Sequence, residues 1–282
     1  MLALVAPCGP PDRDRLLQGV GILDRWGLRW EAGPLVQHYL QGGSREHPFL
    51  SASDERRAEE LAWALGGRFS GCWAVRGGYG LSRLLERLDP GVVPTRLLGF
   101  SDVTALLLWA GRLGWHERLP ASLVHCANVQ TLPLLDGESL EWTRRALIGD
   151  GSSVLSGRIL RPGQAEGPLW GGNLCLLAHL CGTPWSLPPG PKILLLEDVN
   201  EAAYRLDRML MQLQQSRALQ GLQALLLGEF VGCAGAEQLW CDWGQRLGVP
   251  VLTHLPVGHG SRNWPLRLGQ SVRLQGEQLI AL

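Results

Sequence analysis

Short apolar runs alternate with amphipathic segments along the first hundred residues of the chain. The apolar runs end in Gly, Pro or a polar turn, which is typical of buried strands. They cover Leu2–Val5, Leu28–Trp30, Cys72–Val75 and Leu97–Phe100. Helical periodicity, with apolar residues three and four positions apart, fills Asp12–Trp26, Ser53–Leu65 and Gly80–Leu88. Strands that alternate with helices predict a parallel sheet with helices packed on its faces.

The second half of the chain repeats this alternation after a stretch rich in Gly, Ser and Pro. Strands are predicted at Lys192–Leu196, Ala224–Gly228 and Val251–His254, and as a final hairpin at Ser271–Leu274 and Leu279–Leu282. Helices are predicted from Trp170–Asn173 to Cys181, over Glu201–Gln215 and over Ala236–Leu247. The pattern therefore predicts an α/β fold with an N-terminal domain at 1–148, a linker containing a short strand at 149–168, and a C-terminal domain at 169–282.

Composition excludes several classes of protein. The 26 Lys and Arg residues balance 26 Asp and Glu, without a basic stripe, which argues against nucleic acid or an anionic membrane as the main partner. No apolar stretch reaches the roughly 18 residues of a membrane span, and the first residues resemble a strand rather than a signal peptide. Seven cysteines without a C-x-x-C pair indicate reduced thiols and a cytoplasmic protein. Cys175, His179 and Cys181 fit a packed helix face better than a metal site.

The junction Gly99-Phe100-Ser101-Asp102-Val103 is a candidate site of chemistry. A strand ends there and an apolar helix begins at once, so the turn lifts the Ser101 hydroxyl above the sheet, next to free N–H groups of the helix N-terminus. This is the geometry of a nucleophile elbow, although Val103 replaces the second glycine of G-x-S-x-G. A simple helix cap is the alternative interpretation.

The loop Arg76-Gly77-Gly78-Tyr79-Gly80 also follows a strand and precedes a predicted helix. Its glycines expose backbone N–H groups, as an anion cradle requires, although it matches neither G-x-G-x-x-G nor the P-loop. A turn that only needs positive φ would have the same composition. Because ligands bind beyond the carboxyl ends of parallel strands, the loop and Ser101 are expected at the same edge of the sheet.

Glu197 and His259 complete a possible catalytic set. Glu197 ends a buried apolar run, and His259 lies between two glycines that leave its imidazole room to reach neighbours. Taken singly, Glu197 fits a surface acid or a partner of Arg205, and His259 fits an ordinary loop histidine. Together with Ser101 they give the order Ser, acid, His that α/β-hydrolases use, and histidine has the pKa of a general base at neutral pH.

Several blocks of residues, in order across nearly the whole chain, resemble the LD-carboxypeptidases, serine peptidases of murein recycling that are related to the microcin C immunity peptidases. The blocks are Ala6-Pro7-Cys8-Gly9-Pro10, Arg76–Gly80, Gly99–Leu106, Gly171–Leu174, Gly182–Trp185, Leu196–Val199, Tyr204–Arg208 and Gly258–Gly260. Between Gly114 and Pro133, where relatives often carry His-Gly-Pro, this chain reads Leu123-Val124-His125-Cys126-Ala127-Asn128, a departure that concerns the cleft wall and the fit of substrate. The resemblance implies a Rossmann-like nucleophile domain with a largely parallel sheet, a smaller α/β C-terminal domain, and a homodimer.

The resemblance also implies roles for individual residues. Ser101 would be the nucleophile, His259 the base, Glu197 the acid that orients it, and the backbone N–H groups of Gly78 and Asp102 the oxyanion hole. The implied reaction releases the terminal D-alanine from a murein tetrapeptide, without a metal or organic cofactor.

Three further residues are candidates for binding the substrate. Arg76 could bind the terminal carboxylate or only brace its loop. Trp170 and Asn173 could line the cleft, where Trp170 or Trp185 could stack on a base. The alternatives to a carboxypeptidase are a peptidase of peptidyl-nucleotide conjugates, as in microcin C immunity, and a binder of murein peptides without catalytic activity.

Overall fold

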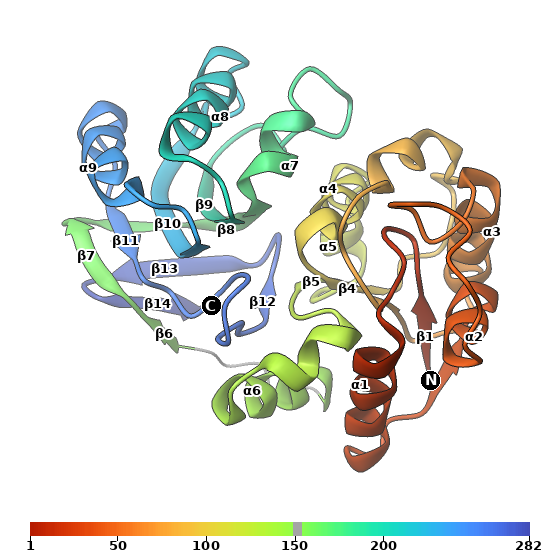
Figure 1. The fold of residues 1–282 in the computed structure, drawn as a ribbon. Helices are drawn as coiled ribbons and strands as arrows, with labels where there is room; N and C mark the ends of the chain where they lie inside the picture. Colours follow the sequence, from red (N-terminus) through yellow and green to blue (C-terminus); the bar gives the residue numbers. More distant parts are fainter. Residues whose placement is uncertain (149–153) are drawn as a thin grey trace.

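The computed structural model describes residues 1–148 and 154–282, which form two sheets side by side (Figure 1). The first sheet has the strand order β12-β5-β4-β3-β1-β2. Its strands are β1 (Leu2–Val5), β2 (Trp30–Ala32), β3 (Gly71–Ala74), β4 (Arg96–Gly99), β5 (Leu123–His125) and β12 (Leu266–Arg267). Strands β1 to β5 run parallel and β12 is antiparallel to β5, so the expected α/β fold with a largely parallel sheet is confirmed.

Helices cover both faces of this sheet because alternate strand residues point to opposite sides. Leu2 and Leu4 pack with α1 (Arg13–Arg25) and α2 (Pro34–Leu40) on one face. Ala3 and Val5 belong to the core on the other face, with α3 (Asp54–Leu65) and α4 (Thr104–Arg112).

The strand order changes direction between β1 and β3, because β2 lies on one side of β1 and β3, β4 and β5 on the other. The loops that leave the carboxyl ends of β1 and β3 meet at this point, where the Gly9 N–H donates to the Gly77 carbonyl at 3.0 Å. Such a reversal opens a crevice at the edge of an α/β sheet. The glycine loop, residues 76–80, therefore lies where this fold binds ligands.

The second sheet has the order β6-β14-β13-β8-β9-β10-β11-β7. Its strands are β6 (Val154–Ser156), β7 (Arg158–Arg161), β8 (Gln164–Asn173), β9 (Lys192–Val199), β10 (Leu222–Val231), β11 (Val251–Thr253), β13 (Ser271–Gln275) and β14 (Gln278–Ala281). Strands β8 to β11 are parallel, and antiparallel strands flank them. Helices α7 (Leu174–His179), α8 (Ala203–Gln215) and α9 (Ala236–Leu247) lie along one side of this sheet (Figure 1).

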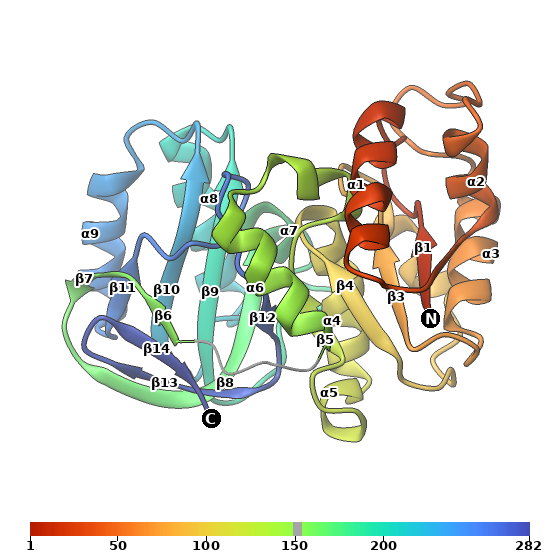
Figure 2. The ribbon, with the colours of Figure 1, turned by 90° about the horizontal axis from the view of Figure 1, so that it is seen from below.

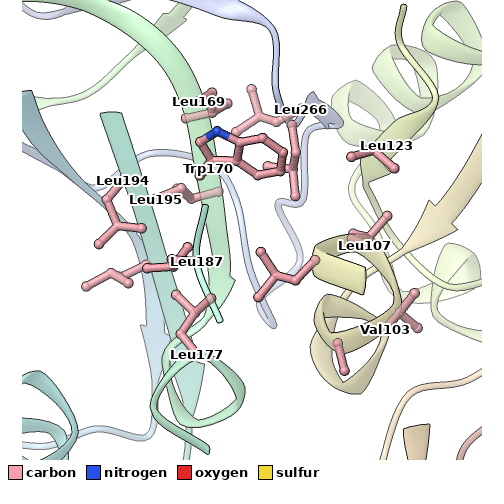
Figure 3. Packing of buried hydrophobic residues seen from close by; sticks show 14 of the residues in the cluster. Val103, Leu107, Leu123, Leu169, Trp170, Leu177, Leu187, Leu194, Leu195 and Leu266 are labelled. Carbon is pink, nitrogen blue, oxygen red and sulfur yellow. The ribbon is translucent and has the colours of Figure 1, made fainter. Parts of the chain in front are cut away.

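Two helices join the sheets. Helix α4 is buried from Thr104 to Gly111, and its residues share one core with Leu123 of the first sheet and Trp170 of the second (Figure 3). Figure 2 shows α6 (Gly137–Ile148) across the same junction, and the short α5 (Trp115–Arg118) packs against α4 through Trp115 and Trp109. None of the helices in the described ranges is long and apolar enough to cross a bilayer.

Gly111 is where α4 approaches the second sheet most closely. A Cβ at this position would lie 2.6 Å from the Trp170 ring, which is buried. We therefore expect Gly111→Ala to lower the free energy of unfolding by about 1–3 kcal/mol, the usual effect of overpacking a core. Gly21→Ala is the matched control, because Gly21 is in the middle of α1 and a Cβ there would meet only the Arg25 guanidinium, at 3.7 Å. It should raise stability by about 0.5–1 kcal/mol. Urea denaturation tests both, and equal effects would contradict the packing assigned to Gly111.

Two predictions of secondary structure are wrong in part. Residues 80–88 form two 3₁₀ turns, Leu81–Arg83 and Leu85–Arg87, instead of one helix. Gly80 has φ +121°, and the first free N–H, that of Leu81, is held by the Asp102 carboxylate, so a distant contact sets the start of this segment. Of the expected linker, residues 149–153 lie outside the described residues, whereas the rest forms β6, β7 and the first half of β8 rather than one short strand. The division into domains at these residues stays a prediction.

Candidate active site

Ser101 lies in a strained turn at the carboxyl end of β4. Its φ is +64°, a left-handed value that costs energy for any residue with a side chain. The chain passes directly from Gly99 through this turn into a 3₁₀ helix, Ser101–Val103, and then into α4. The side chain is half-buried, so the hydroxyl stands at the edge of the sheet, as the elbow interpretation expects.

The Asn128 side chain holds this turn through the backbone of Phe100. The Asn128 side chain accepts from the Phe100 N–H at 3.3 Å and donates to the Phe100 carbonyl at 3.4 Å. A Cβ on Gly99 would come within 2.7 Å of the same amide, so only glycine fits there. Asn128 is buried and follows the carboxyl end of β5, a position that could have marked it as a site residue in the sequence.

The glycine loop packs directly against Ser101. A Cβ on Gly77 would lie 2.9 Å from the Ser101 Cβ and 3.1 Å from its Oγ, and Gly78 has φ +107°. The buried Asp102 carboxylate accepts from the Leu81 N–H at 2.9 Å, so it ties the serine turn to the end of the loop. The serine turn and the glycine loop, to which Asp102 and Gly78 belong, are thus held together, while their role as an oxyanion hole stays a prediction.

Glu197 and His259 form a hydrogen-bonded pair. Glu197 lies within β9, opposite Asn173 of β8, and its side chain is fully buried. His259 Nδ1 is 2.6 Å from Glu197 Oε2, while 17% of the imidazole is exposed. Burial alone would lower the pKa of His259, but the hydrogen bond and negative charge of Glu197 outweigh it, so the pKa is raised above its usual value.

The connection between β11 and β12 brings His259 to Ser101. This segment leaves the second sheet, passes through His259, and adds β12 to the edge of the first sheet. The imidazole then packs on Phe100, the neighbour of Ser101, with ring centroids 4.7 Å apart. Among the hydrogen bonds of residues 1–148 and 154–282, none joins Ser101 to His259.

This arrangement is suited to nucleophilic chemistry. It combines an imidazole oriented by a buried carboxylate, a hydroxyl on a strained turn, and a glycine loop packed against that turn. Catalytic hydrogen bonds are often longer without substrate and tighten in the reacting complex, so the open Ser101–His259 pair is compatible with this chemistry. In the described ranges no group of three His, Cys, Asp or Glu side chains is arranged to hold a metal ion.

The three candidate substrate-binding residues differ in their surroundings. Arg76 is half-buried and donates to the carbonyl of Pro10, in the loop after β1. Trp170 is only 3% exposed and lies edge-to-face against His116, so it is a core residue without a free ring face, and the expectation of stacking there is wrong. Trp185 is partly buried against the same core.

Asn173 is also structural. Its Oδ1 caps α7 by accepting from the Leu176 N–H at 3.1 Å, and its Nδ2 donates to Asp198 at 3.0 Å. Both ends of the amide are therefore occupied, and the side chain is 4% exposed. The prediction that it binds substrate is not supported. Asp198 additionally accepts from the Cys175 N–H at 2.9 Å, so this cluster anchors α7 at the end of β9.

Comparisons with known proteins identify the family of the chain. Residues 2–117 match the family model of the LD-carboxypeptidase N-terminal domain, and residues 166–274 match that of the C-terminal domain. The murein tetrapeptide carboxypeptidase of Pseudomonas aeruginosa is 33% identical over 301 residues, which cover 99% of this chain and 94% of that protein.

Solved structures show the same fold. The crystal structure of muramoyltetrapeptide carboxypeptidase from Oxalobacter formigenes has a TM-score of 0.82 at 27% identity, covering 99% of this chain and 97% of that one. A microcin C7 self-immunity protein in complex with aspartyl sulfamoyl adenosine has a TM-score of 0.82 at 20% identity, with 99% and 95% covered. At that identity the likeness concerns the fold alone.

Proposed function

The chain belongs to the LD-carboxypeptidase family of serine-type hydrolases, and from this premise we propose that it removes the terminal D-alanine from murein tetrapeptides. The observation that carries the proposal is the buried Glu197–His259 pair, 2.6 Å between Oε2 and Nδ1, packed on the residue next to the strained Ser101. The murein tetrapeptide carboxypeptidase at 33% identity supports the choice of substrate.

In the proposed mechanism, His259 takes the hydroxyl proton of Ser101 through Nε2 while Oγ attacks the carbonyl carbon of the scissile amide. The resulting oxyanion accepts hydrogen bonds from the backbone N–H groups of Gly78 and Asp102. His259 then gives the proton to the amine of D-alanine as the C–N bond breaks, which leaves an acyl group on Ser101. Water, deprotonated by the same imidazole, releases the shortened peptide and restores the hydroxyl.

The test is a product analysis by mass. The protein is incubated with murein tri-, tetra- and pentapeptides and with a peptidyl-nucleotide conjugate. We expect loss of one alanine from the tetrapeptide alone. Cleavage of the conjugate instead would favour the microcin-type alternative. If the protein binds the peptides but cleaves none, and if an ester substrate that is released slowly does not acylate Ser101, the non-catalytic alternative is favoured. The intact Glu197–His259 pair argues against that alternative.

Arg76 is the proposed contact for the terminal carboxylate of the peptide. Burial, and then the positive charge of Arg45, lower the pKa of Arg76, and within the described ranges no carboxylate forms an ion pair with it. We expect Arg76→Met to reduce kcat/KM for the free tetrapeptide about 10- to 100-fold, the value of one charge-assisted hydrogen bond. Activity on the terminal amide should change little, so the preference for the free acid collapses.

The matched control is Arg83→Met. Arg83 lies just beyond the same loop, but its guanidinium is paired with Asp54 at 2.7 Å. This variant should keep the preference for the free acid. If Arg76→Met slows both substrates in parallel, then Arg76 acts only as a brace through the Pro10 carbonyl, and another group binds the carboxylate.

We also propose a setting for the enzyme. Its seven cysteines are all free thiols, which suits a reducing cytoplasm where murein fragments are recycled. A homodimer is proposed on family resemblance alone. Light scattering coupled to gel filtration should give about twice the monomer mass of 30.8 kDa.

A further inference from the structure

Three buried polar atoms near the candidate site have no hydrogen-bond partner among residues 1–148 and 154–282. They are both ring nitrogens of His125 and the second carboxylate oxygen of Glu197, Oε1. Both side chains are fully buried, so bulk water cannot satisfy them. Buried polar groups are nearly always hydrogen-bonded, and unpaired ones in a native protein call for an explanation.

His125 and Glu197 belong to the same cluster of side chains. His125 ends β5, opposite Gly99 of β4 on one side and Leu266 of β12 on the other. The Phe100 ring is 6.0 Å from the His125 ring and 4.7 Å from that of His259, between centroids. His259 in turn bonds Glu197.

The charge state of His125 suits a neutral donor. Burial lowers its pKa to about 4, the Glu197 carboxylate opposes that shift, and His259 adds to it. Glu197 and His259 are the titratable groups that influence His125, one from β9 and one from the loop before β12. At neutral pH the ring is therefore an uncharged imidazole with one N–H to donate.

We propose that His125 is a positioning residue whose ring N–H binds Glu197 Oε1 through one buried water. The carboxylate would then be held at both oxygens, by His259 Nδ1–H at Oε2 and by His125 at Oε1. A second hydrogen bond fixes the carboxylate rotamer and shares its charge, so it controls how strongly Glu197 attracts the proton of His259. This inference rests on the proposed function only for its kinetic consequences, because the hydrogen bond can be observed without substrate.

The test compares His125→Leu, which removes the donor, with His125→Gln, which keeps one. Without the donor, the full negative charge of Glu197 stabilises the protonated form of His259. The pKa of His259 should therefore rise by about half a unit or more. The kcat for the tetrapeptide should fall about 10- to 100-fold with KM unchanged, as for other partners that orient a catalytic group. In His125→Gln, both the pKa of His259 and the kcat for the tetrapeptide should stay close to the wild-type values. The control His116→Leu, beyond the far end of α4, should change neither.

Titration of ¹⁵N-labelled histidines by NMR gives the pKa of His259 in the absence of substrate. An unchanged His259 pKa in His125→Leu, or equal losses in the Leu and Gln variants, would overturn the proposal. If His125→Leu does not fold, the wild-type spectrum decides, since the proposal requires a neutral His125 with one ring N–H protected from solvent exchange. If no variant or wild-type protein cleaves the tetrapeptide, the proposed function fails, while the titration still tests the role of His125.

Discussion

Replacing Ser101 with alanine is expected to lower kcat by about 10³-fold or more, because a serine hydrolase without its nucleophile retains only the effects of binding and the oxyanion hole. The fold should be unaffected, since none of the hydrogen bonds within the described ranges uses the Ser101 hydroxyl. Single-turnover assays on the tetrapeptide measure the loss. His259→Ala should cost about as much, and the double variant little more, because the two groups act as a unit.

A glycine at this position gives a sharper comparison. Ser101 has φ +64°, and relief of that conformation is worth about 1 kcal/mol when the side chain is removed completely. Ser101→Gly should therefore melt at a higher temperature than Ser101→Ala while both lack activity. Appreciable activity in either variant, or near-additive losses in the double variant, would contradict the assignment of the nucleophile.

Replacing Glu197 with glutamine should lower kcat about 10³- to 10⁴-fold, as loss of the orienting carboxylate does in other triads. The amide cannot stabilise the imidazolium, and its NH₂ group can face Nδ1 as a donor, which favours the wrong tautomer. The pKa of His259 is raised by Glu197, so in the native enzyme the acid limb of kcat/KM should lie above the usual pH of about 6.5.

In Glu197→Gln that limb should move to lower pH, because the base has lost the charge that retains its proton. Profiles of kcat/KM from pH 4.5 to 9 measure the acid limb of the native enzyme and that of Glu197→Gln. Glu277→Gln, an exposed carboxylate in the turn between β13 and β14, is the matched control and should leave rate and profile unchanged. A profile that stays at the same pH in Glu197→Gln would mean that another group acts as the base.

Local signals made much of the fold predictable. Asp12 and Ser53 were expected at helix starts, and each accepts from a backbone N–H of its own first turn. Helix α2 has no such signal, because its N-cap is Gly33, which lacks a side chain. Its free N–H groups are instead bound by Glu60 from α3, at 2.8 Å for Leu35. A cap that comes from another helix cannot be recognised in the helix it caps.

The candidate site was predictable to a similar extent. Chain order and predicted strand ends made Ser101, Glu197 and His259 candidates, and the structure pairs the last two. The sequence could not distinguish cleft residues from core residues on β8. Trp170 and Asn173 lie next to a glycine pair and look exposed, yet α4 covers the ring and α7 and Asp198 use the amide. Their burial depends on how the two sheets pack, which no local pattern records.

The short strand β12 has a consequence for synthesis of the protein. Glu197 leaves the ribosome 62 residues before His259, and the loop that carries His259 continues into β12, which pairs with β5. A nascent chain can fold much of its first sheet early, but it cannot contain the Glu197–His259 pair until residue 259 has emerged. Products that stop earlier would leave β5 as an unpaired edge, the type of surface on which chains aggregate. Hydrolytic activity would therefore report translation past His259, and chains that end before it would be inactive and prone to removal.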